Sequence, residues 1–278
     1  MTEQKIVFLG TGGDPIVVGG QIRASGGIIV RHGETQLHID PGPGALVMEK
    51  VFGVNPRSTT AILCSHNHLN HANDLNAVIS ALTHSGLDTY GVLVAPASVI
   101  QSDVSSEGAA QNYPSLGAFA RRWLERIIIV EPGKRVAVNE VDITASPTVH
   151  SDSAGVGFKI VTPDFSLGYT SDTEYDKSVS EAFRETDILI LNVVAPFGVK
   201  VKGQLSSEDA ARILSEVKPT LGIITHFGIK MLSADPLHEA RKIQKESGVQ
   251  TIAAKDGMTI DPVSYSARLK QKTLKHFK

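Results

Sequence analysis

Short apolar runs broken by turn-forming residues give the first half of the chain its pattern. Their lengths and their Gly, Asn and Asp boundaries predict strands at residues 6–9, 27–30, 35–39, 60–64, 91–95 and 127–130. Apolar positions recur at helical spacing over residues 74–82, and residues 116–125 also suit a helix. Strands and helices are therefore expected to alternate through this half.

The second half repeats the same alternation without an intervening linker. Strands are predicted at residues 141–145, 157–161, 166–170, 188–192, 221–225 and 250–253, and helices at 177–184, 206–217 and 236–247, with Ser206 as the N-cap of the second. We predict one domain over residues 1–265, built from two similar α/β halves, followed by a basic C-terminal tail at 266–278. Residues 97–113 are the least regular segment and form a candidate lid.

A glycine-rich segment, Gly10-x-Gly12-Gly13, follows the first predicted strand. It has an alternative interpretation as a dinucleotide-binding loop, but Pro15 stands where the third glycine belongs. The β-branched residues 16–18 that follow are not expected to open a helix. A tight turn is the better interpretation.

Composition and charge narrow the class of protein. The 278 residues are 41% hydrophobic and 20% charged, which is typical of a globular protein and excludes a disordered or fibrous chain. The net charge of -2 gives no general attraction to nucleic acid or anionic lipid. Only the C-terminal tail is basic, and we expect it to be solvated, with phosphate contact as the alternative, through Arg268, Lys270, Lys272, Lys275 and Lys278.

No apolar run approaches the ~20 residues that span a bilayer, and the N-terminal segment lacks the layout of a signal peptide. A cytoplasmic location is therefore expected, with no membrane partner. The single cysteine, Cys64, cannot form an internal disulfide and lies in an apolar run that suits a buried strand. Any metal must accordingly be held by histidines and carboxylates.

A cluster of histidines directly follows the predicted strand at residues 60–64. His66, His68 and His71 are three of the ten histidines of the chain and lie within six residues. Imidazole is the usual neutral ligand for zinc and its neighbours, and a turn after a strand can direct side chains at i, i+2 and i+5 to one centre. The cluster predicts a metal site, and a solvent-exposed polar loop is the alternative.

Three more ligand-type residues, His150, Asp172 and His226, each end or follow a predicted strand. Taken singly, each histidine would suit a capped position in the core. Loops at the ends of strands assemble the sites of α/β folds, so these residues can converge with the first cluster. We therefore expect one metal centre built from separate strand ends.

The cluster and the later ligands resemble the metallo-β-lactamase superfamily, whose signature is His-x-His-x-Asp-His followed by a later His, Asp and His. The resemblance covers nearly the whole chain. It is greatest to the RNase Z-like and cyclic phosphodiesterase branch, through Phe8-Leu9-Gly10-Thr11-Gly12-Gly13, His38-Ile39-Asp40-Pro41-Gly42, Ser171-Asp172-Thr173 and Thr225-His226-Phe227.

The resemblance implies an αββα four-layer sandwich with a two-metal site at its edge. It assigns His66, His68 and His150 to the first metal, His71 and His226 to the second, and Asp172 to both. Asn70 stands where the family has a metal-binding aspartate and is included as a candidate ligand. The cofactors would be one or two divalent ions, with zinc expected and manganese or iron as alternatives.

Such a pair of ions lies ~3.5–4 Å apart, lowers the pKa of a bridging water toward ~7 and neutralises charge on the reacting phosphoryl or acyl group. Asp172, His71 and Asp40 are the expected catalytic residues. Asp40 suits a carboxylate that fixes the tautomer of a ligand histidine, or alternatively a turn residue before Pro41. Asp74, one helical turn after Asn70, is expected to cap a helix or to lie on its surface rather than to bind metal.

Three departures from the family pattern limit the expected function. Besides Asn70, Asn192-Val193 stands where the tRNA-processing enzymes have a His-Glu pair, and Gln204 is placed where relatives carry histidine. The sequence also lacks a long Gly/Pro-rich arm for grasping tRNA. We therefore expect a metal-dependent hydrolase, foremost a phosphodiesterase that acts on a small or cyclic phosphodiester, and no nucleic-acid substrate.

Two alternatives stay open. The same centre suits a hydrolase of a thioester, lactone or β-lactam, and the three departures together also suit a metal-binding protein with lost or reduced turnover. A homodimer is a further open alternative.

Overall fold

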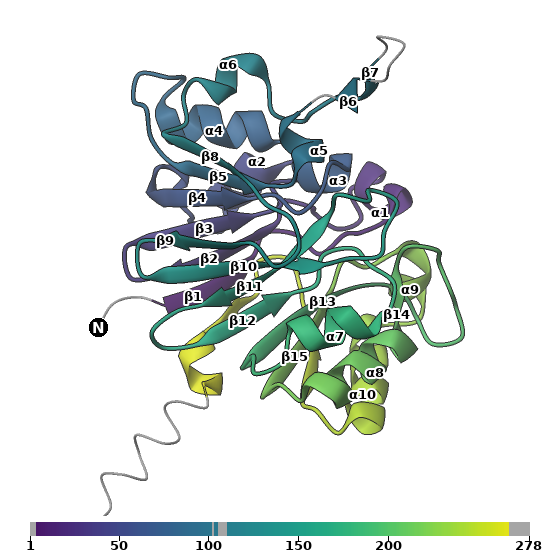
Figure 1. Ribbon diagram of the computed structural model, residues 1–278. Helices are drawn as coiled ribbons and strands as arrows, with labels where there is room; N and C mark the ends of the chain where they lie inside the picture. The colour runs from purple at the N-terminus through teal and green to yellow at the C-terminus, as the bar shows by residue number, and fades with distance from the viewer. Residues whose placement is uncertain (1–3, 102, 105–109, 267–278) are drawn as a thin grey trace, which may run out of the picture.

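Two β-sheets pack face to face and carry helices on their outer faces (Figure 1). The computed structural model describes residues 4–101, 103–104 and 110–266. This arrangement is the predicted αββα sandwich. It follows from a chain whose strands have an apolar side chain on each face, because both faces must then be covered.

The first sheet has seven strands in the order β17-β1-β2-β3-β4-β5-β8. Strands β3, β4, β5 and β8 are parallel, whereas β1 is antiparallel to β17 and to β2. The bounds are Gln4–Phe8 for β1, Ile28–His32 for β2, Thr35–Ile39 for β3, Thr59–Leu63 for β4, Val92–Ala95 for β5, Arg126–Ile129 for β8 and Thr259–Ile260 for β17.

The second sheet has the order β16-β15-β13-β12-β11-β10-β9, with the short β14 paired to β13. Strands β12, β13, β15 and β16 are parallel. The bounds are Arg135–Val138 for β9, Val141–Pro147 for β10, Val156–Val161 for β11, Ser166–Tyr169 for β12, Ile188–Ala195 for β13, Leu205–Ser206 for β14, Leu221–Thr225 for β15 and Thr251–Ala253 for β16.

Helices fill the two outer layers. Those packed on the first sheet are α2 (Ala45–Val51), α4 (Leu75–Thr83), α5 (Ala97–Ile100) and α6 (Ala118–Arg121). Those packed on the second are α7 (Lys177–Ala182), α8 (Ser207–Val217), α9 (Ile229–Ser233) and α10 (Pro236–Ser247). The remaining helical segments are α1 (Pro15–Gly19), α3 (Leu69–Ala72), η1 (Pro56–Ser58) and η2 (Pro262–Tyr265). Among the described residues, no helix is long and apolar enough to cross a membrane.

Alternate residues of the central strands enter different cores, as the two-residue period of a strand requires. In β4, Ala61 and Leu63 face the core between the sheets, whereas Ile62 packs with α4 in the outer layer. In β13, Ile190 faces the inner core and Leu191 packs with the outer helices. The rigid double sheet thus fixes the ends of its strands.

The ends that carry the candidate ligands meet at one edge. Strands β10 and β12 are both antiparallel to β11, so they run in the same direction as each other and as β13 and β15. Their carboxyl ends precede His150, Asp172 and His226. The end of β4 in the facing sheet precedes the cluster that begins at His66.

Two local predictions were wrong. Residues 16–18 do form part of a short helix, α1, because Asp14 accepts a hydrogen bond from the Val17 amide and Pro15 begins the helix, where no N–H is needed. The helix expected over residues 116–125 is only α6, preceded by Gly117. Side-chain capping accounts for α1, whereas α6 has no side-chain cap at its start.

The candidate lid at residues 97–113 comprises α5, which packs on the first sheet, and the paired strands β6 (Asp103–Val104) and β7 (Ala110–Asn112). Only the two strands project from the body of the protein (Figure 1). Residues 102 and 105–109 lie outside the described residues, and a lid role stays a prediction. The basic residues of the tail, from Arg268 onward, also lie outside the described part of the chain. Ser266, the first residue of the predicted tail, is buried.

Candidate metal centre

The segment after β4 directs the side chains of three histidines toward one edge of the sandwich. His66 follows the strand directly, His68 is the N-cap of α3, and His71 lies in the last turn of that helix. His66 and His71 are buried, with 1% and 2% exposure. A buried imidazole needs a partner for each ring nitrogen, so the environment of each nitrogen shows its role.

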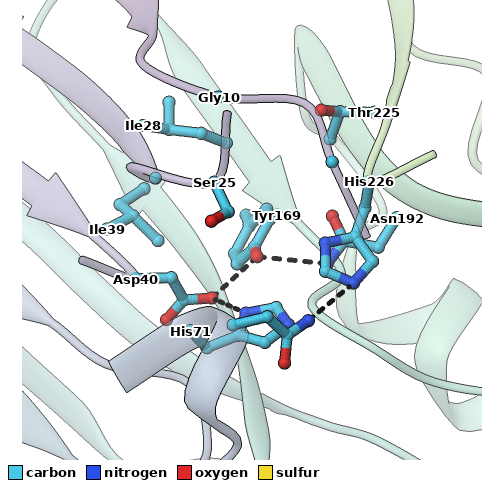
Figure 2. Close-up of a pocket in the computed structure, with 13 residues that line it drawn as sticks. Gly10, Ser25, Ile28, Ile39, Asp40, His71, Tyr169, Asn192, Thr225 and His226 are labelled. Atoms are coloured by element: carbon cyan, nitrogen blue, oxygen red, sulfur yellow. Dashed lines mark hydrogen bonds and ion pairs between the residues drawn. The ribbon is translucent and has the colours of Figure 1, made fainter. Parts of the chain in front are cut away.

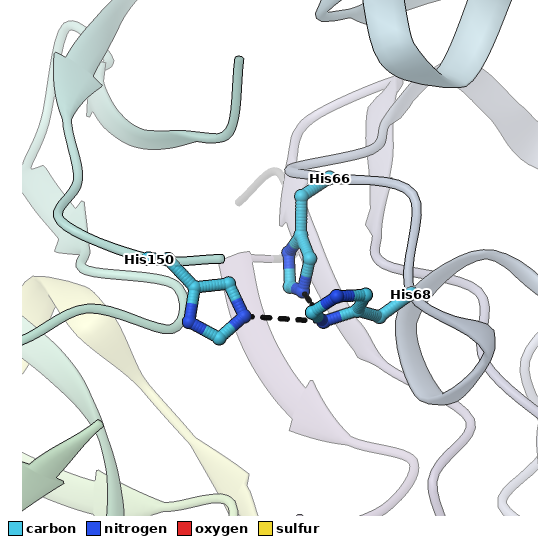
Figure 3. A group of neighbouring side chains, drawn as sticks. All are labelled: His66, His68 and His150. Carbon is cyan, nitrogen blue, oxygen red and sulfur yellow. Dashed lines mark hydrogen bonds between the residues drawn. The ribbon is translucent and has the colours of Figure 1, made fainter. Parts of the chain in front are cut away.

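A first group of nitrogens comes from His66, His68 and His150 (Figure 3). Nδ1 of His68 lies 3.0 Å from Nε2 of His66 and 3.1 Å from Nε2 of His150. Nδ1 of His150 donates to the carbonyl oxygen of Gly203 at 2.7 Å, which leaves the lone pair of its Nε2 facing the group. Three imidazole nitrogens therefore converge on one point.

A second group adjoins the first through a shared carboxylate. Asp172 lies between His71 and His226, with its Oδ2 3.4 Å from Nε2 of His71 and its Oδ1 3.2 Å from Nε2 of His226. Oδ2 of Asp172 also lies 3.9 Å from Nε2 of His150. The structure thus brings six of the predicted ligands together, with Asp172 between the two groups.

Asp40 lies beside His71 (Figure 2) and sets the tautomers of two histidines. Its Oδ2 accepts hydrogen bonds from Nδ1 of His71 at 2.8 Å and from Oγ of Ser65 at 2.7 Å. Because the Ser65 hydroxyl donates to Asp40, its oxygen accepts from Nδ1 of His66, 3.0 Å away. Both histidines therefore carry a proton at Nδ1, which leaves Nε2 as the nitrogen through which each would bind a metal ion.

The hydroxyl of Tyr169 also donates to Oδ2 of Asp40, at 2.7 Å. That hydroxyl in turn accepts from the amide of Asn192 at 3.2 Å (Figure 2). Asn192 thus connects Asp40 with Asp172, because its Nδ2 also lies 2.7 Å from Oδ1 of Asp172.

Gln204 holds the other oxygen of Asp172. Its Nε2 donates to Oδ2 at 2.8 Å, so each carboxylate oxygen of Asp172 accepts a hydrogen bond from one amide. Asn192 and Gln204 are two of the departures from the family pattern that the sequence revealed, and both contact the central carboxylate.

Asn70 turns its amide nitrogen, not its oxygen, toward the second group. Nδ2 lies 3.3 Å from Nε2 of His226 and donates to the carbonyl oxygen of Gly13 at 3.0 Å. In this orientation Asn70 presents a donor where a metal ligand would present an oxygen. Its role as a ligand stays a prediction.

Asp74 caps a helix, one of the roles expected for it. Its Oδ2 accepts from the backbone amides of Gly44 and Ala45 at 2.9 and 3.0 Å, at the start of α2. The amide groups at a helix N-terminus favour such a carboxylate. These bonds account for Asp74 without a metal.

The electrostatic environment shifts the pKa values of the two buried histidines, His66 and His71, in opposite directions. Burial lowers the pKa of His66 well below 6.5, and the neighbouring His71 lowers it further. Burial also disfavours the charged form of His71, but the carboxylates of Asp172 and Asp40 outweigh it and raise the pKa of His71 from 6.5 to about 10. Burial opposes ionisation of Asp172, yet His226 and His71 hold the pKa of its carboxyl well below 3.8.

The residues present fit divalent ions. Nε2 of His71 is buried and, among the described residues, makes no hydrogen bond beyond its 3.4 Å contact with Oδ2 of Asp172, although Nδ1 of the same ring is held by Asp40. An unpartnered buried nitrogen is costly unless a ligand satisfies it. The donor set is imidazole with a carboxylate, which suits zinc and its neighbours in the first transition row.

The glycine-rich segment after β1 packs against the centre. A Cβ at Gly13 would lie 2.2 Å from the carbonyl oxygen of His226, so only glycine fits there. Gly12 forms a β-bridge with Phe227, next to His226. Close backbone approach thus explains the glycines, and the segment forms this β-bridge instead of the predicted tight turn.

Two cavities adjoin the centre. The smaller, of about 30 Å³, lies among Asp40, His71, Tyr169, Asn192 and His226 (Figure 2). The larger, of about 430 Å³, begins at Gln204. Its other lining residues are Glu174, Tyr175, Lys200, Val201, Lys202 and Asp209. Its volume falls in the range of small-molecule sites.

Sequence reasoning missed three residues of this network, Ser65, Tyr169 and Ser171. Oγ of Ser171 donates to Oγ of Ser65 at 2.8 Å and thereby joins the link between Asp40 and His66. Each of the three lies within three residues of a predicted ligand. That proximity was the available signal, but it does not reveal which hydroxyl points inward.

Comparison with known proteins gives one curated relative. It is the uncharacterized protein MJ1374 of Methanocaldococcus jannaschii, 32% identical over 259 residues, a match that covers 92% of this chain and 94% of the relative. The chain is therefore similar to that protein over almost its whole length.

Solved structures share the fold at low identity. The metallo-β-lactamase fold protein YhfI from Bacillus subtilis has a TM-score of 0.73 and 18% identity, over 92% of this chain and 98% of that one. The short form of human tRNase Z has a TM-score of 0.65 and 15% identity, over 93% and 99%. A diphosphatase from the PhnP family has a TM-score of 0.62 and 14% identity, over 93% and 97%.

The sequence also matches a family model, the β-lactamase superfamily domain, over residues 35–227. This range contains every candidate ligand. The match spans more than half of the chain, and the solved structures share its fold. The chain belongs to the β-lactamase superfamily and has the metallo-β-lactamase fold.

Proposed function

We propose that this protein is a metal-dependent phosphodiesterase that acts on a small or cyclic phosphodiester. The observation that carries the proposal is Asp172 between two groups of imidazole nitrogens, with His150 on one side and His71 and His226 on the other. Two ions sharing a carboxylate suit in-line displacement at phosphorus, because charge builds on both the attacking and the leaving oxygen.

Divalent ions bound there would supply Lewis acidity, which neutralises a phosphoryl oxygen and acidifies water. The side chains of the chain prepare the site for them. Asp40 and Ser65 keep protons at Nδ1 of His71 and His66, and the Gly203 carbonyl does the same for His150. The amides of Asn192 and Gln204 fix the orientation of Asp172. Preorganisation of this kind removes reorganisation from the reaction step.

The larger cavity supports a small substrate. It opens at Gln204, one side chain away from Asp172, and its volume of about 430 Å³ accommodates a small molecule. The net charge of -2 offers no extended attraction for a polynucleotide. Two of the structural neighbours, tRNase Z and the diphosphatase, act by their names on phosphate compounds, which favours phosphorus chemistry over acyl transfer.

The test is hydrolysis of bis(p-nitrophenyl) phosphate by protein loaded separately with zinc, manganese and iron, beside a panel of thioesters, lactones and β-lactams. We expect turnover of the phosphodiester in at least one metal form, and no comparable turnover of the panel. Turnover confined to an acyl substrate would replace the proposal by the acyl-hydrolase alternative.

A second candidate function is metal binding with lost or reduced turnover. It is favoured by Asn70, whose amide nitrogen faces His226 where the family places a carboxylate. Bound metal without hydrolysis of either class, after loading with each metal, would support this candidate. A homodimer is likewise a proposal, and sedimentation of the metal-loaded protein tests it.

A further inference from the structure

Asp172 accepts amide hydrogen bonds on both of its oxygens. Asn192 donates to Oδ1 at 2.7 Å and Gln204 to Oδ2 at 2.8 Å. An amide donates hydrogen bonds but does not release its proton to a leaving group, unlike an imidazolium or a carboxylic acid. The two side chains that contact Asp172 from outside the histidine groups therefore provide no general acid.

Of the two cavities beside the centre, only the one on the side of Gln204 has room for a leaving group. Histidines face Asp172 from the metal groups, whereas Gln204 lines the cavity of about 430 Å³. The remaining polar atom of Gln204, Oε1, is a buried carbonyl oxygen. It accepts hydrogen bonds and has no proton to donate. Lys200, also on the cavity wall, is paired with the carboxylate of Asp209 at 2.6 Å, and the carboxylate of Glu174 accepts from the backbone amide of Gly203.

Proton supply matters for one class of phosphodiester. Water adds to phosphorus, the bond from phosphorus to the leaving oxygen breaks with its electron pair, and the two protons of water go to the phosphate product and to solvent. An alkoxide is too basic to leave in this way without a proton, whereas a phenolate or a phosphate is not. General acid catalysis contributes about 10²–10⁴-fold where it is needed.

We propose that Gln204 restricts this site to phosphodiesters whose leaving group departs as a stable anion, such as a phenol, an enol or the phosphate of an anhydride. This inference rests on the proposed phosphodiesterase function and specifies its substrate class. Gln204 acts as a specificity-determining residue, because a histidine in its place would supply the missing proton.

The experiment measures kcat/KM of the zinc-loaded protein for methyl aryl phosphates with dinitrophenol, p-nitrophenol and phenol as leaving groups, and for dimethyl phosphate. We expect kcat/KM to fall by about 10²–10⁴-fold from the most to the least acidic leaving group, the size of the absent acid contribution. The readout is the slope of log kcat/KM against leaving-group pKa, determined separately for each variant. A loss of activity that is equal for all substrates leaves this slope unchanged.

Gln204→His should flatten that slope, whereas Gln204→Asn, an amide that adds no acid, should leave it steep. Lys202→Gln should also leave it steep, since Lys202 lines the same cavity and its ammonium is the competing proton donor. Metal content and proton NMR titration of the added imidazole verify, without an activity assay, that the histidine variant is loaded and that the new group titrates.

A shallow slope in the wild type, an unchanged slope in Gln204→His or a steeper slope in Lys202→Gln would each overturn the inference while the phosphodiesterase function stands. Absence of hydrolysis even of the dinitrophenyl ester would overturn the proposed function itself.

Discussion

Oδ2 of Asp40 lies 2.8 Å from Nδ1 of His71, and both groups are almost completely buried. The carboxylate directly follows strand β3 and the imidazole lies in α3, so the bond joins two residues that are 31 positions apart in the chain. The bond holds one proton of His71 at Nδ1 and directs Nε2 toward Asp172. Asp40 is therefore a positioning residue for the centre.

We expect Asp40→Asn to weaken zinc binding by about 10–100-fold, because a carboxamide is a poorer partner for the ligand histidine and breaks the link through Ser65 to His66. A competition titration with a chromophoric chelator measures the change. Asp261→Asn, at an exposed turn, is the matched control. Equal zinc affinity in Asp40→Asn and in this control would show that Asp40 does not orient a ligand.

Binding of zinc at the second group, which contains His71, should release about one proton at neutral pH. The pKa of His71 is raised to about 10 in the metal-free protein, so its imidazole is charged at pH 7 and must become neutral to bind metal. Calorimetric titration in buffers of different ionisation enthalpy measures the release. No proton release at pH 7 would contradict the charge assigned to His71.

The same shift predicts the pH dependence of stability in the metal-free protein. Because the folded-state pKa is raised, the stabilisation from His71 is complete below its ordinary pKa of 6.5 and is lost as pH rises through about 10. Denaturant midpoints of the metal-free protein should therefore fall over this interval. The decline should be smaller in Asp40→Asn, which removes one cause of the shift.

We expect His66→Ala or His68→Ala to abolish metal at the first group and to reduce hydrolysis to background, since each supplies one of three converging nitrogens. Metal analysis and the phosphodiester assay provide the two readouts. His238→Ala, at an exposed position of α10, is the control. Native metal content together with full activity in either variant would refute the assignment of the first group.

Asn70→Asp should raise metal occupancy at the second group and lower the stability of the metal-free protein. The new carboxylate adds negative charge and an oxygen beside His226, but without metal it faces the Gly13 carbonyl to which Asn70 now donates. Metal titration and thermal unfolding with and without metal test both effects. Asn70→Ala removes the hydrogen bond without adding charge.

Two equally tight metals in the wild-type protein, unchanged by Asn70→Asp, would show that charge at position 70 does not limit the second group. The carboxylate of Asp74 accepts hydrogen bonds from two backbone amides at the start of α2. Asp74→Ala should therefore lower the stability of the protein and leave its metal content unchanged. Loss of one metal in Asp74→Ala would instead assign that carboxylate to the centre.

Incubation with pre-tRNA should give no cleavage at the 3′ end of the acceptor stem. Asn192 stands where the tRNA-processing enzymes have the His-Glu pair, and its amide donates hydrogen bonds to Asp172 and Tyr169. The net charge of -2 also gives no general attraction to RNA. Gel analysis beside human tRNase Z as a positive control measures this. Cleavage at a rate near that for a small phosphodiester would contradict the prediction.

The sequence by itself determined the local features of this protein. Short apolar runs bounded by turn-forming residues located the main strands, and the cap at Ser206 located the start of α8, because both signals arise from neighbouring residues. Ligand-type residues immediately after strands identified His66, His68, His71, His150, Asp172 and His226 as candidates. Strand ends are fixed by the sheet, so their proximity could be expected.

Only the tertiary structure decided which polar groups meet. Asn192 and Gln204 looked in the sequence like losses from a catalytic set, yet each donates to Asp172 from a different element. Asp40 has its partners 25 to 129 residues away, in Ser65, His71 and Tyr169. A hydrogen bond requires a donor–acceptor distance within a few tenths of an ångström and a suitable direction. The packing of the two sheets sets both, and no local pattern in the chain encodes that packing.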